Sequence, residues 1–177
     1  MDAYQCVISK RDLRRYADRS LDRETLVKIL DAGRRSGSAR NHQPWEFVVV
    51  TRRDGLDRLA RYGVVAHHLR HAQTAVLITI DGPDDLFDAG RCAQNMMLAA
   101  WALGVASCPV TLQRAGELKL ALGIPAGRIV AITIAFGYPH PDGRSRTERL
   151  ALAVLAPRGR KSLEALVQWE RYGARTD

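Results

Sequence analysis

The 177-residue chain has few aromatic residues, three cysteines and no long apolar run. No stretch approaches the roughly 18 consecutive apolar residues of a membrane span, and the start MDAYQCVISKRDLRR lacks the apolar core of a secretory signal. Cys6, Cys92 and Cys108 form no Cys-x-x-Cys pair and have no histidine at metal-ligand spacing. We therefore expect a cytoplasmic protein whose core needs no disulfide. We also expect no metal site and no contact with a membrane.

Motifs for nucleotides and nucleic acids are also missing. The chain contains no G-x-G-x-x-G fingerprint, so the sequence does not choose between NADH and NADPH. It has no zinc-finger, RNA-recognition or KH signature, and its arginines are scattered through helices and loops. The formal net charge of +8 still predicts attraction of anions. A phosphorylated cofactor explains that charge better than a nucleic acid does.

The length and composition indicate one globular domain with helices and strands. Apolar spacing and capping residues predict helices at 22–33, 88–103, 117–122 and 163–172, and β-branched runs predict buried strands at 47–51, 75–80 and 129–136. Gly104 is expected to end the central helix and lead into a further strand. His67, His68 and His71 fall in another expected helix, with too few ligands for a metal. The Pro-, Gly- and Arg-rich segment 139–160, with a strand-like LALAVL, is interpreted as an extension.

Five motifs occur in a fixed order along the chain. They are SKRDLRRY, SARNHQPWEFVVV, DAGRCAQNMMLAAWALGVASC, the pair LGIP and IAFGYP, and RGRKSLEALVQWERYG. Taken singly, each has a structural explanation: a solvated basic face, a loop at a helix exit, or a glycine cap before a strand. Taken together, they make the chain resemble the FMN-dependent nitroreductase family over nearly its whole length.

The resemblance implies an α+β fold over residues 1–177. In this family a mixed central sheet lies between helices as a three-layer sandwich, and two chains form an intertwined homodimer with two flavin sites at the interface. The segment 139–160 is then expected to wrap the partner subunit.

The resemblance also implies a set of FMN-binding residues. Lys10, Arg11 and Arg14 inherit the grip on the flavin phosphate and ribityl chain, where guanidinium groups donate paired hydrogen bonds. A basic pair from the carboxyl segment closes that site, and the loop after the first long helix and the strand near Cys108 contact the flavin ring. The full expected set is Lys10, Arg11, Asp12, Arg14, Gly37, Ser38, Ala39, Asn41, Pro109, Val110, Thr111, Arg158 and Arg160.

Three positions depart from the family pattern. Asp12 stands where relatives have serine, and we expect its carboxylate to turn away from the phosphate and pair with Arg14, Arg15 or another arginine. Gly37 replaces a frequent proline, and Thr111 with Leu112 replaces Glu-Gly. The resemblance places the chemistry on flavin N5, so no catalytic side chain is expected, and Cys108 is interpreted as a buried thiol.

The function implied is ping-pong transfer of hydride from NADH or NADPH through FMN to electron-poor acceptors such as nitroaromatics or quinones. One alternative keeps the fold but changes the reaction, as in dehalogenases, azoline oxidases, flavin-fragmenting enzymes and deazaflavin users. Another is a non-enzymatic protein that binds flavin or nucleic acid.

Overall fold

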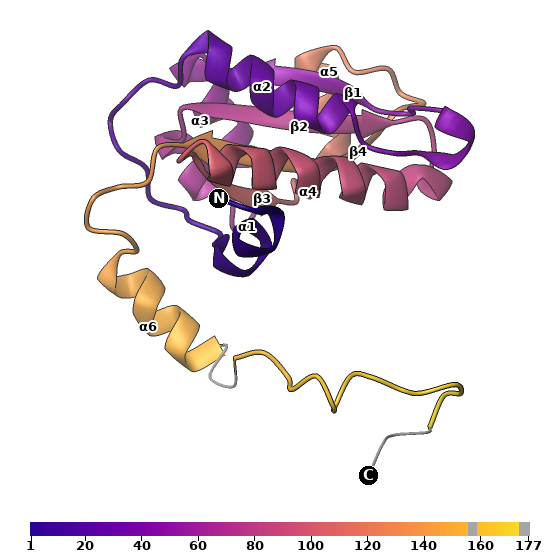
Figure 1. Ribbon diagram of the computed structural model, residues 1–177. Coiled ribbons are helices and arrows are strands. Elements are labelled where there is room, and N and C mark those ends of the chain that lie inside the picture. The colour runs from indigo at the N-terminus through magenta and orange to yellow at the C-terminus, as the bar shows by residue number, and fades with distance from the viewer. Residues whose placement is uncertain (156–158, 174–177) are drawn as a thin grey trace. The chain divides into compact units, whose positions relative to one another are not determined.

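The computed structural model describes residues 1–155 and 159–173. The chain divides into two compact units, Met1–Gly143 and Arg144–Asp177, which we describe separately (Figure 1). The first unit contains all the strands named below and most of the expected site residues.

The elements follow one another in mixed order. The helices are α1 (Ala3–Ser9), α2 (Arg23–Arg34), α3 (Arg53–Leu59), α4 (Leu86–Ala102), α5 (Ala115–Leu122) and, in the second unit, α6 (Arg146–Leu155). The strands are β1 (Glu46–Val50), β2 (Thr74–Ile80), β3 (Ala106–Val110) and β4 (Ile129–Gly137). Short 3-10 helices are η1 (Ala39–Asn41), η2 (Ala60–Tyr62), η3 (His67–His71) and η4 (Pro83–Asp85).

The strands form one sheet in the order β1-β2-β4-β3. All three strand pairs run antiparallel, and Val76 of β2 lies opposite Ile134 of β4. Among the described residues, the parallel pairing expected of a mixed sheet is limited to an isolated bridge between Asp12 and Ser107 at the β3 edge. That bridge brings the amino-terminal basic segment to the sheet.

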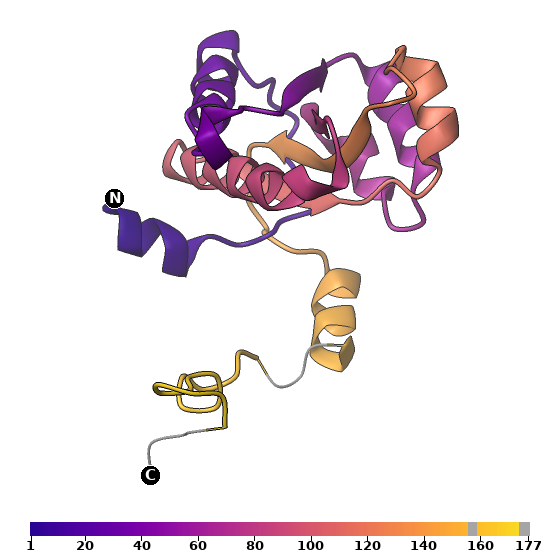
Figure 2. The same cartoon turned by 90° about the vertical axis from the view of Figure 1, so that its right-hand side faces the viewer.

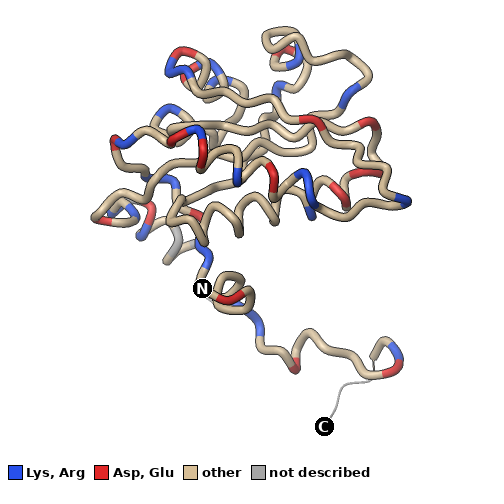
Figure 3. The backbone as a smooth tube through the Cα atoms, turned by 45° about the horizontal axis from the view of Figure 1, so that its top comes forward, with Lys and Arg blue, Asp and Glu red and all other residues tan. Residues whose placement is uncertain are grey.

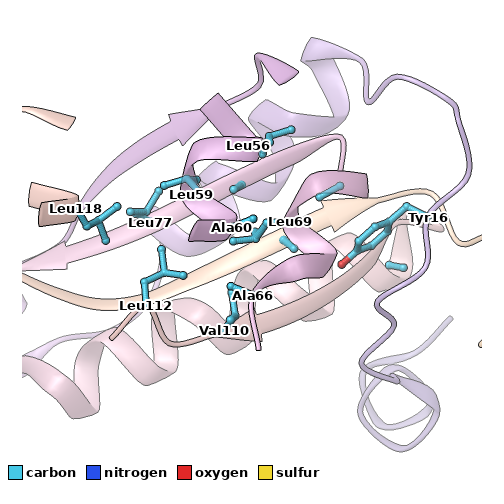
Figure 4. Close-up of a cluster of buried hydrophobic side chains, with 14 of the residues drawn as sticks. Tyr16, Leu56, Leu59, Ala60, Ala66, Leu69, Leu77, Val110, Leu112 and Leu118 are labelled. Carbon is cyan, nitrogen blue, oxygen red and sulfur yellow. The ribbon is translucent and has the colours of Figure 1, made fainter. Parts of the chain in front are cut away.

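Helices cover both faces of the sheet, as seen in Figure 2. Every residue of β2 is buried, and its side chains alternate between two apolar clusters. On one face Ala75 and Leu77 pack with α3, η3 and α5, where Leu56, Leu59 and Leu118 are fully buried (Figure 4). On the other face Val76 and Ile78 pack with α2 and α4. The described unit is therefore a three-layer sandwich.

Close packing joins α2 to α4 on that second face. Asp22 caps α2 through a 2.8 Å hydrogen bond from the Thr25 hydroxyl and a 2.7 Å bond from its backbone N–H. Near the other end of α2, a Cβ added to Gly33 would lie 2.8 Å from Met96 Cγ and 3.2 Å from Cys92 Sγ. The glycine thus allows the two helix backbones to approach.

The expected elements of the first unit are confirmed within a few residues. The strands at 47–51, 75–80 and 129–136 are β1, β2 and β4, and the helices at 22–33, 88–103 and 117–122 are α2, α4 and α5. Gly104 has a φ of 75° and is followed by β3, as expected. The histidine segment is helical but is the short 3-10 helix η3.

Two expectations for the carboxyl segment are wrong. LALAVL lies in the helix α6 and is not a strand; its alternation of Leu and Ala is also compatible with one helical face. Residues 163–172 form turns instead of a helix, and Leu163, Leu166, Trp169 and Tyr172 are largely exposed. A short amphipathic helix is marginal unless another surface buries its apolar face.

Charge is distributed over the whole first unit. In Figure 3 acidic positions alternate with basic ones along the backbone, and pairs such as Lys28 with Glu24 and Arg35 with Asp31 join them on helix surfaces. Within the described part of the chain, no helix combines the length and the hydropathy needed to cross a bilayer.

Candidate functional site

The amino-terminal basic segment runs along the edge of β3. Lys10 ends α1, and Leu13 N–H donates to the Ser107 carbonyl at 3.1 Å, beside the Asp12–Ser107 bridge. Tyr16 then packs into the apolar cluster beneath η3 (Figure 4). The backbone contacts explain how an irregular stretch holds several charged side chains in fixed positions.

Lys10 and Asp12 form an ion pair within this segment. Lys10 Nζ donates to Asp12 Oδ1 and lies 3.5 Å from Met97 Sδ of α4. The lysine side chain is mostly buried, whereas that of Asp12 is 46% exposed. The Asp12 carboxylate therefore neutralises the least accessible cation of the cluster.

Arg11 and Arg14 are exposed. Arg11 Nη1 donates to the carbonyls of Ile8 and Lys10 at 2.8 and 2.9 Å, so its guanidinium lies against the end of α1. Arg14 lies near a buried histidine, His68. Burial is the larger cause and the positive charge of Arg14 the smaller one, and together they lower the pKa of His68 from its usual 6.5 to about 4. The basic segment and η3 thus face each other.

His68 is the unusual group of this region. Its side chain is 1% exposed, and the contact of its ring with the Val65 backbone falls short of a well-aligned hydrogen bond. The Ser107 hydroxyl, beside Asp12 and Leu13, is also buried without one. Buried polar groups are nearly always hydrogen-bonded, because leaving one unpaired costs about 1–3 kcal/mol. The expected site residues omitted both groups, although the HHLRH run marked the position of His68.

The loop after α2 has a strained backbone. Arg40, Asn41 and Gln43 have φ values of 52°, 56° and 53°, in the left-handed region that non-glycine residues avoid at a cost of about 1 kcal/mol each. Ser38 Oγ accepts from Gln43 N–H at 2.8 Å and helps to close the turn. Such strain persists where surrounding structure holds it, and it is concentrated at functional sites.

The third group of expected residues lies at the end of β3. Pro109 pairs with Ile134 and buried Val110 with Thr133, and Thr111 follows the strand on the surface. Cys108 is buried, as expected of a structural thiol. Through Ser107, this strand is tied directly to the segment of Asp12 and Leu13.

The structure brings only some of the expected residues together. The basic segment adjoins β3 at Ser107, near the start of the strand, and Lys10 contacts α4 at Met97. The loop with Ser38 and Ala39 contacts α4 at Asp88, nine residues earlier, about 13 Å away along the helix. Arg160 is exposed in the second unit, and Arg158 lies outside the described residues.

One group of side chains has metal-ligand chemistry. Ligand atoms of His42, Asp81 and Asp85 lie within 4.8 Å of one another at the surface. Arg128 Nη1 contacts Asp81 Oδ1 at 2.5 Å and already supplies a positive charge there. The group therefore gives no reason to propose a metal. That the protein has no metal site stays a prediction.

Comparison with known proteins agrees with this architecture. The chain is 30% identical over 152 residues to the "Putative NADH dehydrogenase/NAD(P)H nitroreductase" of Archaeoglobus fulgidus, covering 80% of this chain and 87% of the relative. It is similar in structure to a "putative nitroreductase in complex with fmn" from Desulfovibrio desulfuricans, with a TM-score of 0.81, 29% identity, and coverage of 97% and 99% of the two chains. A Bacteroides thetaiotaomicron structure, 24% identical with 96% and 98% coverage, shares the fold at a TM-score of 0.82. The nitroreductase family profile matches residues 7–75 and 63–138, and the chain belongs to that family.

Proposed function

We propose that this protein is an FMN-dependent oxidoreductase that uses NADH or NADPH to reduce electron-poor acceptors such as nitroaromatics or quinones. The observation that carries the proposal is the exposed Arg14 facing the buried His68 within a member of the nitroreductase family. The FMN complex of the Desulfovibrio relative and the name of the Archaeoglobus relative support the choice of cofactor and donor.

The amino-terminal residues fit a phosphorylated cofactor. Lys10, Arg11 and Arg14 would hold its phosphate and ribityl chain, and Arg158 and Arg160 would complete the basic surroundings. Guanidinium groups suit this role because their paired N–H groups match phosphate oxygens.

Two backbone segments would orient the flavin ring. Gly37, Ser38, Ala39 and Asn41 would contact the ring from a loop whose strained conformation is held by α4. Pro109, Val110 and Thr111 would line it from the β3 edge, mainly through backbone groups. When bound, FMN supplies the hydride chemistry itself, which leaves binding, orientation and exclusion of water to these residues.

A homodimer would complete the pocket. The loop of Gly37 to Asn41 and the basic segment contact α4 at positions about 13 Å apart. The loop of one chain and the basic segment of the other could therefore bind the same flavin. A partner's loop would then face the phosphate site, and the segment 139–160 would wrap the partner. We place this dimer in the cytoplasm, without membrane or nucleic-acid partners.

Steady-state kinetics tests the proposed reaction. Donor and acceptor would use the same pocket in turn, so double-reciprocal plots at several quinone concentrations should be parallel, with NADPH or NADH as donor. Intersecting lines would contradict the shared pocket. Bound flavin that neither nicotinamide reduces would favour the other flavin reactions of this fold.

A further inference from the structure

A polar stripe of α4 contacts the loop after α2. Asp88, Arg91 and Asn95 are spaced three and four residues apart, so they lie on one helical face. Asn95 Nδ2 donates to Ser36 Oγ at 2.8 Å, and Asp88 Oδ2 accepts from Ala39 N–H at 3.1 Å. The stripe therefore holds both sides of Gly37.

Gly37 provides space for the middle member of the stripe. A Cβ at this position would lie only 3.1 Å from Arg91 Cζ and still closer to Nη2, so the guanidinium occupies the place that a larger residue would need. Arg91 Nη1 is also 3.6 Å from Asp88 Oδ1. The glycine and the arginine thus fit each other, and the arginine in turn neutralises Asp88.

Asp88 is the most informative residue of the three. It is 8% exposed and lies in the first turn of α4, where the helix dipole favours a carboxylate. Its bond to Ala39 N–H is charge-assisted and reaches across 49 residues of sequence, directly before Arg40 and Asn41 with their left-handed backbone. A buried carboxylate used in this way fixes the loop more firmly than the internal bonds of the turn alone.

We propose that Asp88 is a positioning residue for the flavin ring, acting through Ala39 to hold the loop of Gly37 to Asn41 in its strained conformation. The inference rests on the proposed function and adds a residue that does not itself touch the cofactor. Removing the carboxylate would let the loop relax, and the ring environment would change while the basic segment at the other end of α4 stayed intact.

The test compares four full-length proteins: wild type, Asp88→Ala, Asp88→Asn and Glu117→Ala. Asp88→Asn keeps an acceptor oxygen for Ala39 N–H. Glu117→Ala is the matched control, because Glu117 forms a similar pair with an arginine three residues away, Arg114, at 3.7 Å on the exposed face of α5. The rate of hydrogen exchange at residues 36–43 in flavin-free protein measures the stability of the loop conformation. Titration of the same proteins with FMN measures the effect of each substitution on the affinity for the cofactor.

We expect Asp88→Ala to speed exchange in residues 36–43 and to weaken FMN binding, each about tenfold, the effect of losing a hydrogen bond to a charged group. The visible spectrum of its bound flavin should also shift. Asp88→Asn should restore most of the protection and affinity, and Glu117→Ala should match the wild type.

Wild-type exchange and flavin binding in Asp88→Ala would overturn the inference. So would a folded Asp88→Asn that is as defective as Asp88→Ala, because the charge toward Arg91 would then matter and the bond to Ala39 would not. If the wild type binds no FMN, the proposed function itself fails. This outcome is distinct from a failure of the inference, because hydrogen exchange in flavin-free protein tests the loop without FMN.

Discussion

At the scale of single residues, the basic segment contains charges with different roles. Arg14 is exposed beside buried His68, and the mostly buried Lys10 forms an ion pair with Asp12. Arg14 therefore places its charge at the surface, and Asp12 neutralises Lys10. Asp12 was expected to pair with an arginine, and the ion pair described here joins it to Lys10.

This difference predicts opposite effects of two substitutions on FMN affinity. Arg14→Ala should weaken binding roughly 10- to 100-fold, because a hydrogen bond to a charged group contributes about 1.5–3 kcal/mol. Asp12→Ser should leave affinity similar or higher, since it removes a negative charge near the phosphate. Titration of the flavin-free variants measures both. Arg15→Ala, at a neighbouring arginine paired with Asp142, serves as the control. Loss of binding in Asp12→Ser with a silent Arg14→Ala would show that the phosphate site is elsewhere.

His68 predicts a pH dependence of stability. Burial and the nearby Arg14 lower its pKa in the folded protein to about 4, below the usual 6.5. Between these values the unfolded chain binds a proton that the folded chain does not, so the free energy of unfolding should fall as the pH is lowered, by roughly 3 kcal/mol in all.

Urea denaturation of flavin-free protein above and within this pH window tests the prediction. In His68→Met the contribution should vanish, so the variant should lose less stability than the wild type as the pH falls. Equal losses in the two proteins would mean that His68 is not a buried neutral imidazole.

At the scale of elements, the close contact between α2 and α4 depends on a glycine, Gly33, which has no side chain. Gly33→Ala should lower the free energy of unfolding by up to about 2 kcal/mol net, because Met96 and Cys92 fill the space that a Cβ needs and forcing one in costs about 1–3 kcal/mol. This steric cost exceeds the gain of about 1 kcal/mol from replacing a helical glycine. Thermal unfolding measures the change.

Gly116→Ala is the matched control for this substitution. Gly116 lies in the helix α5 with no atom near its added Cβ, so alanine there should have no effect or raise the melting temperature slightly. An unchanged or raised melting temperature in Gly33→Ala would show that α4 repacks freely.

The elements that sequence predicted correctly are those that carry their own signals. β2 is a β-branched apolar run, and α2 has its cap at Asp22 and an apolar face. The short helix α1 was not predicted, although Asp2 accepts from Gln5 N–H and caps it. α3 was not predicted either, because Gly55 interrupts its short pattern. Elements of seven residues depend on tertiary contacts that periodicity does not show.

The candidate site divides in the same way. Motif order identified Arg14, Ser38 and Asn41, and the structure places each in a constrained segment. Motif order did not identify His68 or Asp88, because their importance comes from burial and from interactions with Arg14 and Ala39 respectively. Those contacts join residues far apart in sequence, so a linear pattern contains no direct sign of them.

At the scale of the whole molecule, the described residues of the second unit contribute to neither of the buried apolar clusters. Leu150, Val154, Leu166 and Trp169 are between 55% and 69% exposed. Exposed apolar residues in this number favour association. We predict a dimer in sedimentation at all concentrations at which FMN stays bound, and a monomer after truncation at Gly143. A full-length monomer that binds FMN tightly would contradict the shared pocket.

The central claim is that this chain is a flavin enzyme, and the visible absorbance spectrum of the purified protein tests it most directly. The account predicts a yellow protein that releases about one FMN per chain on denaturation, bleaches when NADH or NADPH is added without oxygen, and melts at a higher temperature with excess FMN. A colourless protein whose melting temperature does not respond to added FMN would contradict it.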